Sequence, residues 1–127
     1  MGRNFLNEVS FYCLESENQF FDRKSARIKP LDIIRHLVAF ANAEGGQLAI
    51  GIENDGKITG FNYDGAHKID EYKNICFTEL KETPLSVNFD VLKAKNENGK
   101  NDEILIISVD MSSDRVIKSH DGKVFLR

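Results

Sequence analysis

The hydrophobic positions of the chain follow helical spacing in two segments and strand-like spacing in several others. The clearest helical pattern begins at Pro30, whose fixed φ suits the first turn of a helix. Apolar residues then recur on one helical face, at Leu31, Ile34, Leu37, Val38 and Ala41. Gly45 and Gly46 predict the end of this helix, because glycine enters the left-handed cap conformation without a steric clash. A second helix is predicted within residues 65–81.

Two apolar runs predict the interior strands of a sheet. Residues 47–52 form a short apolar run, and we expect a central strand that is buried on both faces. Residues 104–109 form a second strongly apolar strand. Between them, Asn54-Asp55-Gly56 is a strong turn signal, so residues 57–61 are expected to return as the second strand of a hairpin.

Weaker patterns predict the remaining elements. Residues 19–22 carry two aromatic side chains and suggest a short strand. Residues 87–91 alternate apolar and polar side chains, which indicates a half-buried strand after Pro84 closes the second helix. Residues 115–127 contain a His-Asp-Gly turn signal and predict another hairpin. Residues 5–14 have no clean period and fit either a short helix or a strand-like lead-in.

This order of elements favours a two-layer α+β domain with a mixed, mostly antiparallel sheet and two main helices. The length of 127 residues suits a single domain that spans residues 1–127. Because the chain stops on an apolar strand, we expect it to be the N-terminal part of a longer protein.

Composition narrows the setting of the protein. No apolar run approaches the roughly 20 residues that span a bilayer, and the N-terminus has no secretory signal pattern. We therefore expect a cytoplasmic protein without a membrane partner. The two cysteines, Cys13 and Cys76, lie far apart and show no ligand spacing, so small buried side chains are expected rather than a disulfide or a zinc site.

Charge is unevenly distributed along the chain. The net charge of −3 does not suggest that the whole surface binds nucleic acid. One short segment is nevertheless strongly basic and contains Arg23, Lys24, Arg27, Lys29 and Arg35. Such a cluster can bind phosphates even on an acidic protein, and on charge alone the alternative is a solvated entry to the helix.

The glycine-rich segment after the central strand resembles a phosphate-binding loop in spacing only. Gly51, Gly56 and Lys57 match the glycine and lysine positions of a P-loop. Ile58 stands where a magnesium-binding Ser or Thr is needed, and a strand is expected where a helix should follow. These differences argue against ATP binding, and we expect no cofactor except a divalent metal under the nuclease alternative below.

A second set of residues fits metal-dependent phosphodiester cleavage. Glu17, Asp22 and either Glu53 or Asp55 would supply the oxygen ligands that divalent cations prefer, and Lys24 would stabilise the charge on phosphorus. Acids at such positions are more often solvated turn residues. His36, one turn before Phe40, is expected to pack or to cap rather than to bind a ligand.

Two blocks of residues are specific enough to suggest a known family. The first block is Glu17, Asp22 and Lys24, with four residues and one residue between them. The second is the run 38–60, which contains Ala-Phe-Ala-Asn, Gly-Gly and Asn-Asp-Gly. Together they resemble the Schlafen-type AlbA-like domain, which is assigned to DNA binding in many bacterial transcriptional-regulator and helicase-like proteins. Older descriptions of this family as a divergent ATPase fit the glycine-rich stretch.

The resemblance implies an α+β domain for nucleic-acid binding, and some Schlafen relatives use three acids to cleave RNA. Glu17 and Asp22 match the first two acids, with Asp22 in place of the usual glutamate. The third acid falls at Asn54, where the carboxylate is missing, and Arg23 replaces the usual aromatic residue before Lys24. These departures weaken the nuclease interpretation.

Three hypotheses follow. The first is a nucleic-acid-binding module of a bacterial transcriptional regulator, with DNA favoured over RNA and phosphate contacts from Arg23, Lys24, Arg27, Lys29 and Arg35. The second is a metal-dependent ribonuclease whose catalytic residues are Glu17, Asp22, Lys24 and Asp55. The third is a non-catalytic domain that forms a homo-oligomer or binds another protein. The sequence leans against an enzyme.

Overall fold

The computed structural model of the protein describes residues 5–80 and 85–111. Within these ranges three helices and four strands follow one another as α1 (Phe5–Leu14), β1 (Phe21–Lys24), α2 (Pro30–Asn42), β2 (Gly46–Ile50), α3 (Ile69–Glu79), β3 (Val87–Lys95) and β4 (Asn101–Val109). The predicted α+β class is confirmed. None of the described helices is long and apolar enough to cross a membrane.

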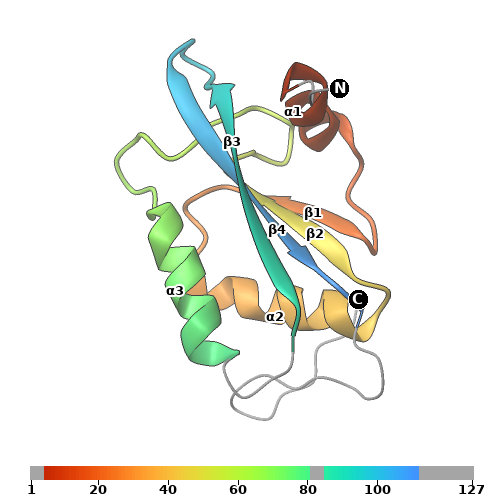
Figure 1. Ribbon diagram of the computed structural model, residues 1–127. Helices are drawn as coiled ribbons and strands as arrows, with labels where there is room; N and C mark the ends of the chain where they lie inside the picture. The colour runs from red at the N-terminus through yellow and green to blue at the C-terminus, as the bar shows by residue number, and fades with distance from the viewer. Residues whose placement is uncertain (1–4, 81–84, 112–127) are drawn as a thin grey trace.

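The four strands form one mixed sheet in the order β1-β2-β4-β3 (Figure 1). β1 and β2 are parallel, with Lys24 opposite Ile50. β2 pairs with β4, and β4 with β3, in antiparallel register, so that Ile50 lies opposite Leu105 and Val91 follows next across the sheet. The prediction of a mixed, mostly antiparallel sheet is therefore confirmed. α2 is the crossover that connects the two parallel strands.

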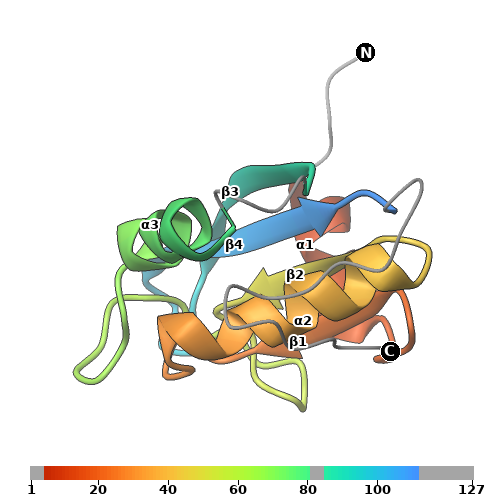
Figure 2. The same ribbon diagram turned by 90° about the horizontal axis from the view of Figure 1, so that it is seen from below.

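Helices α2 and α3 cover one face of the sheet, and α1 lies against the other (Figures 1 and 2). Side chains of β2 alternate between these faces: Leu48 and Ile50 belong to the cluster under α2 and α3, whereas Ala49 belongs to the α1 cluster. All three are fully buried, as expected for a central strand. Cys76 is buried in the first cluster, and both cysteines are free.

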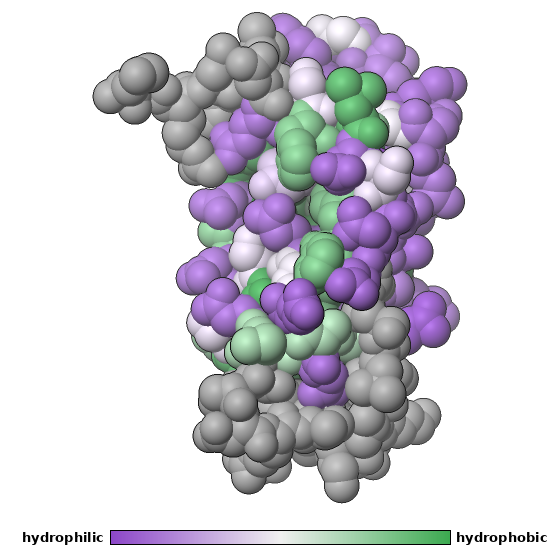
Figure 3. Space-filling view, turned by 90° about the vertical axis from the view of Figure 1, so that its right-hand side faces the viewer, coloured by the Kyte–Doolittle hydropathy of each residue, from purple (hydrophilic) through white to green (hydrophobic). Residues whose placement is uncertain are grey.

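Helix α1 adds a third helix to the two that the sequence predicted. Val9 and Tyr12 bury one side of it in the α1 cluster, which also contains Phe21, Ala49, Ile52, Leu92, Ile104 and Ile106. Phe11 and Leu14 remain exposed on the other side. On this face of the molecule, hydrophobic surface is interspersed with hydrophilic surface (Figure 3). Apolar side chains on both sides of α1 explain why its sequence shows no clear period.

The double glycine that ends α2 is required by packing. The Gly45 amide donates to the Phe40 carbonyl at 2.8 Å, and Gly45 has a φ of +86°, the left-handed region that favours glycine. A Cβ on Gly45 would lie 2.7 Å from the Val109 carbonyl oxygen. A Cβ on Gly46 would overlap the Phe40 ring. The pair lets the chain reverse against α2 and β4 without a clash.

Two predicted elements differ in the structure. The short aromatic strand lies at Phe21–Lys24 rather than at residues 19–22. The predicted hairpin after β2 is wrong: residues 52 and 58 form a single bridge, and residues 57–61 form no strand. The amides of Thr59 and Gly60 both donate to the Gly51 carbonyl, which turns the chain away from the sheet. Pro84 and the predicted 115–127 hairpin lie outside the described residues.

Candidate nucleic-acid interface

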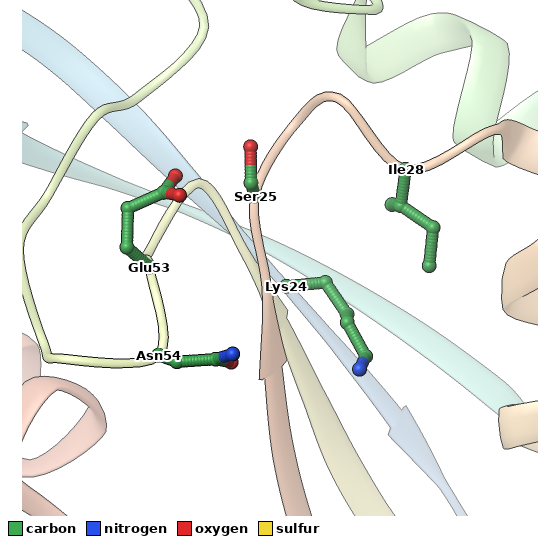
Figure 4. Close-up of a pocket in the computed structure, with 5 residues that line it drawn as sticks. All are labelled: Lys24, Ser25, Ile28, Glu53 and Asn54. Atoms are coloured by element: carbon green, nitrogen blue, oxygen red, sulfur yellow. The ribbon is translucent and has the colours of Figure 1, made fainter.

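The carboxyl ends of β1 and β2 meet at one edge of the sheet and open a small pocket there. Because the two strands are parallel, the segments that follow them lie next to each other. Lys24, Ser25, Ile28, Glu53 and Asn54 line the pocket, whose volume is about 330 Å³ (Figure 4). In Figure 4 the Asn54 side chain points toward Lys24, whereas the Glu53 carboxylate points away from Lys24.

Residues 24–29, which we call the basic loop, connect β1 to α2 and are fixed from α3. The Tyr72 hydroxyl donates to the carbonyls of Ala26 and Ile28 at 3.0 and 2.7 Å. The His67 amide donates to the same Ala26 carbonyl at 2.8 Å. Burial raises the pKa of Tyr72, so its hydroxyl remains a donor at every physiological pH. The loop backbone is thus held independently of any ligand.

Arg27, in the middle of the basic loop, stacks on Tyr63 from a later segment of the chain. The guanidinium carbon of Arg27 lies over the Tyr63 ring, 4.6 Å from its centre. The Ser25 hydroxyl is 3.1 Å from the Tyr63 hydroxyl and accepts the Arg27 amide, also at 3.1 Å. Ser25 therefore ties the two partners together, while Arg27 itself is exposed.

Four of the five predicted phosphate contacts reach the surface. Arg27, Lys29 and Arg35 are exposed, and Lys24 is partly exposed at the rim of the pocket. Lys29 directly precedes Pro30, the first residue of α2, where the helix dipole adds positive potential. The cations are therefore grouped around the start of α2.

Arg23 is the exception among the predicted basic contacts. Its side chain is buried, with 5% exposure. Its guanidinium donates to the carbonyls of Tyr12, at 3.1 Å, and of Glu15, and it lies 5.1 Å from the centre of the Phe21 ring. Arg23 thus fixes the end of α1 to β1, and we do not include it in the interface.

Two acids of the nuclease hypothesis share a hydrogen-bond donor, and the third lies in a separate turn. Glu17 and Asp22 both accept the Arg23 amide, at 3.4 and 2.8 Å, whereas Asp55 accepts the Lys57 amide at 3.0 Å in an exposed turn. Asp22 is buried beneath α2, where its carboxylate lies 3.6 Å from His36 Nδ1. Among residues 5–80 and 85–111, no three His, Cys, Asp or Glu side chains gather where they could hold a metal ion.

The turn after β2 is a structural feature of the chain. Glu53 accepts the Thr59 hydroxyl at 2.6 Å, and its amide donates to the Lys57 carbonyl at 2.8 Å. A Cβ on Gly56 would lie 2.6 Å from the Cys13 carbonyl oxygen, because the turn packs against the end of α1. Residues 57–68 contain no helix, so the helix that a P-loop needs does not follow Gly56.

Sequence reasoning did not find three residues that shape this site. Tyr72 lies within the helix predicted for residues 65–81 but carried no predicted role, Tyr63 was not singled out, and the contact of His36 with Asp22 was not predicted. Each acts on residues far away in the sequence, and spacing along one chain gives no signal for such pairs. The position of His36, packed between α2 and β1, agrees with the packing role predicted for it.

Comparison with known proteins gives one finding. The family model described as SLFN_AlbA_2 (Schlafen, AlbA_2) matches residues 17–127. This match includes the whole basic loop and both strands that border the pocket, and it begins after α1. A search of curated proteins finds no match.

Proposed function

Because the chain belongs to the Schlafen AlbA_2 family, we propose that it binds nucleic acid through the basic loop and the start of α2. The family suggests a nucleic-acid-related function. The observation that carries the proposal is the group of surface cations Lys24, Arg27 and Lys29 on a loop whose backbone is already fixed, with Arg35 exposed on the helix that follows. In the form we favour, the ligand is DNA and the chain is the binding module of a cytoplasmic, bacterial transcriptional regulator.

Physical chemistry supports phosphates as the groups that these cations contact. The net charge of −3 does not attract nucleic acid from a distance, and salt screens each exposed cation beyond about 10 Å. The phosphates must therefore come close to these cations. The amino end of α2 adds a positive dipole beside Lys29. Because Tyr72 and His67 hold the loop, little backbone entropy is lost when a phosphate is bound.

We propose binding without catalysis. Glu17 and Asp22 share the Arg23 amide, whereas Asp55 accepts the Lys57 amide in a separate turn. Among the described residues, no third acid completes a metal-binding group with Glu17 and Asp22. Asp22, the acid nearest to Lys24 along β1, is buried against α2. A carboxylate in that position stabilises the contact between β1 and α2 instead of facing a substrate.

Salt-dependent binding tests the proposal. Fluorescence anisotropy of labelled DNA and RNA is measured over a range of salt concentrations with the wild type and with the double variant Lys24→Gln, Lys29→Gln. Each lost phosphate contact should reduce the slope of log K against log[salt] by about 0.7 to 0.9, so the double variant should lose about 1.5. The weakening should be the same for every sequence.

The matched control is the double variant Lys95→Gln, Lys100→Gln, which removes two exposed charges at the β3–β4 turn. It should leave the slope unchanged. If the wild type binds neither DNA nor RNA at low salt, or if the control matches the Lys24→Gln, Lys29→Gln variant, the basic loop is not the interface. Tighter binding of RNA than of DNA would keep the interface and reverse the preferred ligand.

A further inference from the structure

The stacked pair Arg27–Tyr63 distinguishes this loop from an ordinary cluster of surface cations. Lys24 and Lys29 end in point charges, which suit phosphates. Arg27 instead lays a planar cation over an aromatic ring, at 4.6 Å from its centre, and is itself exposed. A guanidinium stacked in this way has one face on the ring and the other available to a flat ligand.

We propose that the Arg27–Tyr63 pair stacks an unpaired base, so that the ligand of the basic loop is a single-stranded segment of nucleic acid. The inference rests on the proposed function and specifies its ligand. Bases in a duplex show only their edges, whereas an unpaired base exposes its π face. Arginine planes and aromatic rings are the protein groups that such faces stack on.

The arrangement of the surrounding residues supports a base rather than a phosphate at this pair. Lys24 and Lys29 flank Arg27 in the sequence and supply cations for the phosphates on either side of a base. Asp64, which is exposed, follows Tyr63 directly and brings a negative charge that disfavours phosphate beside the ring.

Both partners of the pair are positioned before any ligand binds. Ser25 contacts the Tyr63 hydroxyl and the Arg27 amide. On the other side, the amides of Phe61 and Asn62 donate to the buried carboxylate of Asp102, at 2.9 and 3.4 Å, and so fix the segment that leads into Tyr63. A preformed stacking surface loses less side-chain entropy on binding than a mobile one.

The experiment combines a protein change with a ligand change. Arg27→Lys keeps the charge and removes the plane. The probes are a labelled short oligothymidylate, a strand of the same length whose nucleotides are abasic, and a duplex of that length. We expect Arg27→Lys to weaken binding of the oligothymidylate about tenfold and to leave binding of the abasic strand and of the duplex within about twofold. Tyr63→Phe, which keeps the ring, should retain most of the affinity for the oligothymidylate.

Each result decides between stacking and plain charge. Equal effects of Arg27→Lys on the intact and abasic strands, or no effect on either, would overturn base stacking and leave the interface in place. Binding of the duplex but not of single strands would do the same. If the wild type binds none of the three probes and also fails to bind an oligouridylate of the same length, the proposed function fails as well as this inference. Binding that Arg27→Lys does not weaken selectively overturns this inference alone, so the two failures can be distinguished.

Discussion

One buried hydroxyl holds the basic loop, and the change Tyr72→Phe measures how strongly. The Tyr72 side chain is fully buried, so phenylalanine fills the same space and only the hydrogen bonds are lost. One hydroxyl carries one proton, which the carbonyls of Ala26 and Ile28 share. The Ala26 carbonyl keeps the amide of His67, so the loss falls mainly on Ile28.

The expected magnitude follows from this geometry. A net hydrogen bond contributes about 0.5 to 1.5 kcal/mol, and a partly buried carbonyl that loses its donor adds a desolvation cost. We therefore expect Tyr72→Phe to lower the free energy of unfolding by about 1 to 2 kcal/mol. For a chain of 127 residues that corresponds to a decrease in Tm of about 4 to 7 °C.

Thermal unfolding followed by circular dichroism measures this loss, with Tyr63→Phe as the control. The control removes a tyrosine hydroxyl that contacts the partly buried Ser25 side chain, where water can replace it. Its cost should stay at or below about 0.5 kcal/mol. Hydrogen exchange at the Ile28 amide, which donates to the Ser25 backbone carbonyl, should accelerate in Tyr72→Phe. Affinity for nucleic acid should fall about two- to tenfold although Tyr72 is not exposed.

An unchanged Tm together with unchanged exchange at Ile28 would show that the loop does not depend on Tyr72. A lower Tm without faster exchange would assign the hydroxyl to the core rather than to the loop. Loss of affinity with unchanged Tm and unchanged exchange at Ile28 would require Tyr72 to contact the ligand directly. Because Tyr72 is buried, that result would refute this reasoning.

Three further predictions concern the rest of the domain. Burial alone would raise the pKa of Asp102, but hydrogen bonds from the amides of residues 61, 62 and 103 and from the Asn96 side chain lower it below its ordinary value of 3.8. The carboxylate therefore stabilises the fold at neutral pH, and this stability is lost as the pH falls below about 4 through the lowered pKa. In urea titrations, Asp102→Asn should lower the free energy of unfolding by about 1 to 2 kcal/mol at pH 7 and should flatten this dependence on acid pH. Gly46→Ala should cost about 2 to 3 kcal/mol in the same titrations, because its Cβ would overlap the Phe40 ring and lie 2.7 Å from the Phe20 carbonyl oxygen. A cost near zero would mean that both the ring and the Phe20 backbone can move aside. Incubation of tRNA-like substrates with manganese should give equal background for Asp22→Ala and the wild type, and cleavage by the wild type alone would restore the nuclease hypothesis.

The elements that local pattern determines could be predicted from the sequence. Pro30 and the apolar stripe after it gave the bounds of α2 closely, and the apolar run after Gly46 gave β2. Both depend on neighbours within a few residues. The expected hairpin at 57–61 failed because its conformation depends on Gly60, which has a φ of +68°, and on Asp102, which binds the next segment from β4.

The candidate site was predictable in its charges and not in its architecture. The clustering of basic residues along the chain predicted the basic segment, and four of its cations are at the surface. Whether a given cation is exposed depends on tertiary packing, and Arg23 is buried because α1 supplies the carbonyls that bind it. The same limit applies to Tyr63 and Tyr72, whose roles arise from contacts with a loop some 40 residues earlier.

Helix α1 has a consequence for how this domain should be produced. The family match begins at residue 17, whereas the carbonyls of Tyr12 and Glu15 that hold Arg23 come before it. A protein truncated at the family boundary would uncover the apolar residues beneath α1 and release the Arg23 guanidinium on the face of the sheet opposite to that of Ile50, the partner of Lys24. Such a fragment would carry an exposed apolar face and an accessible cation that the intact chain buries, so its measured affinity for nucleic acid would not represent that of the intact chain. The folding unit therefore extends beyond the boundary that the family defines.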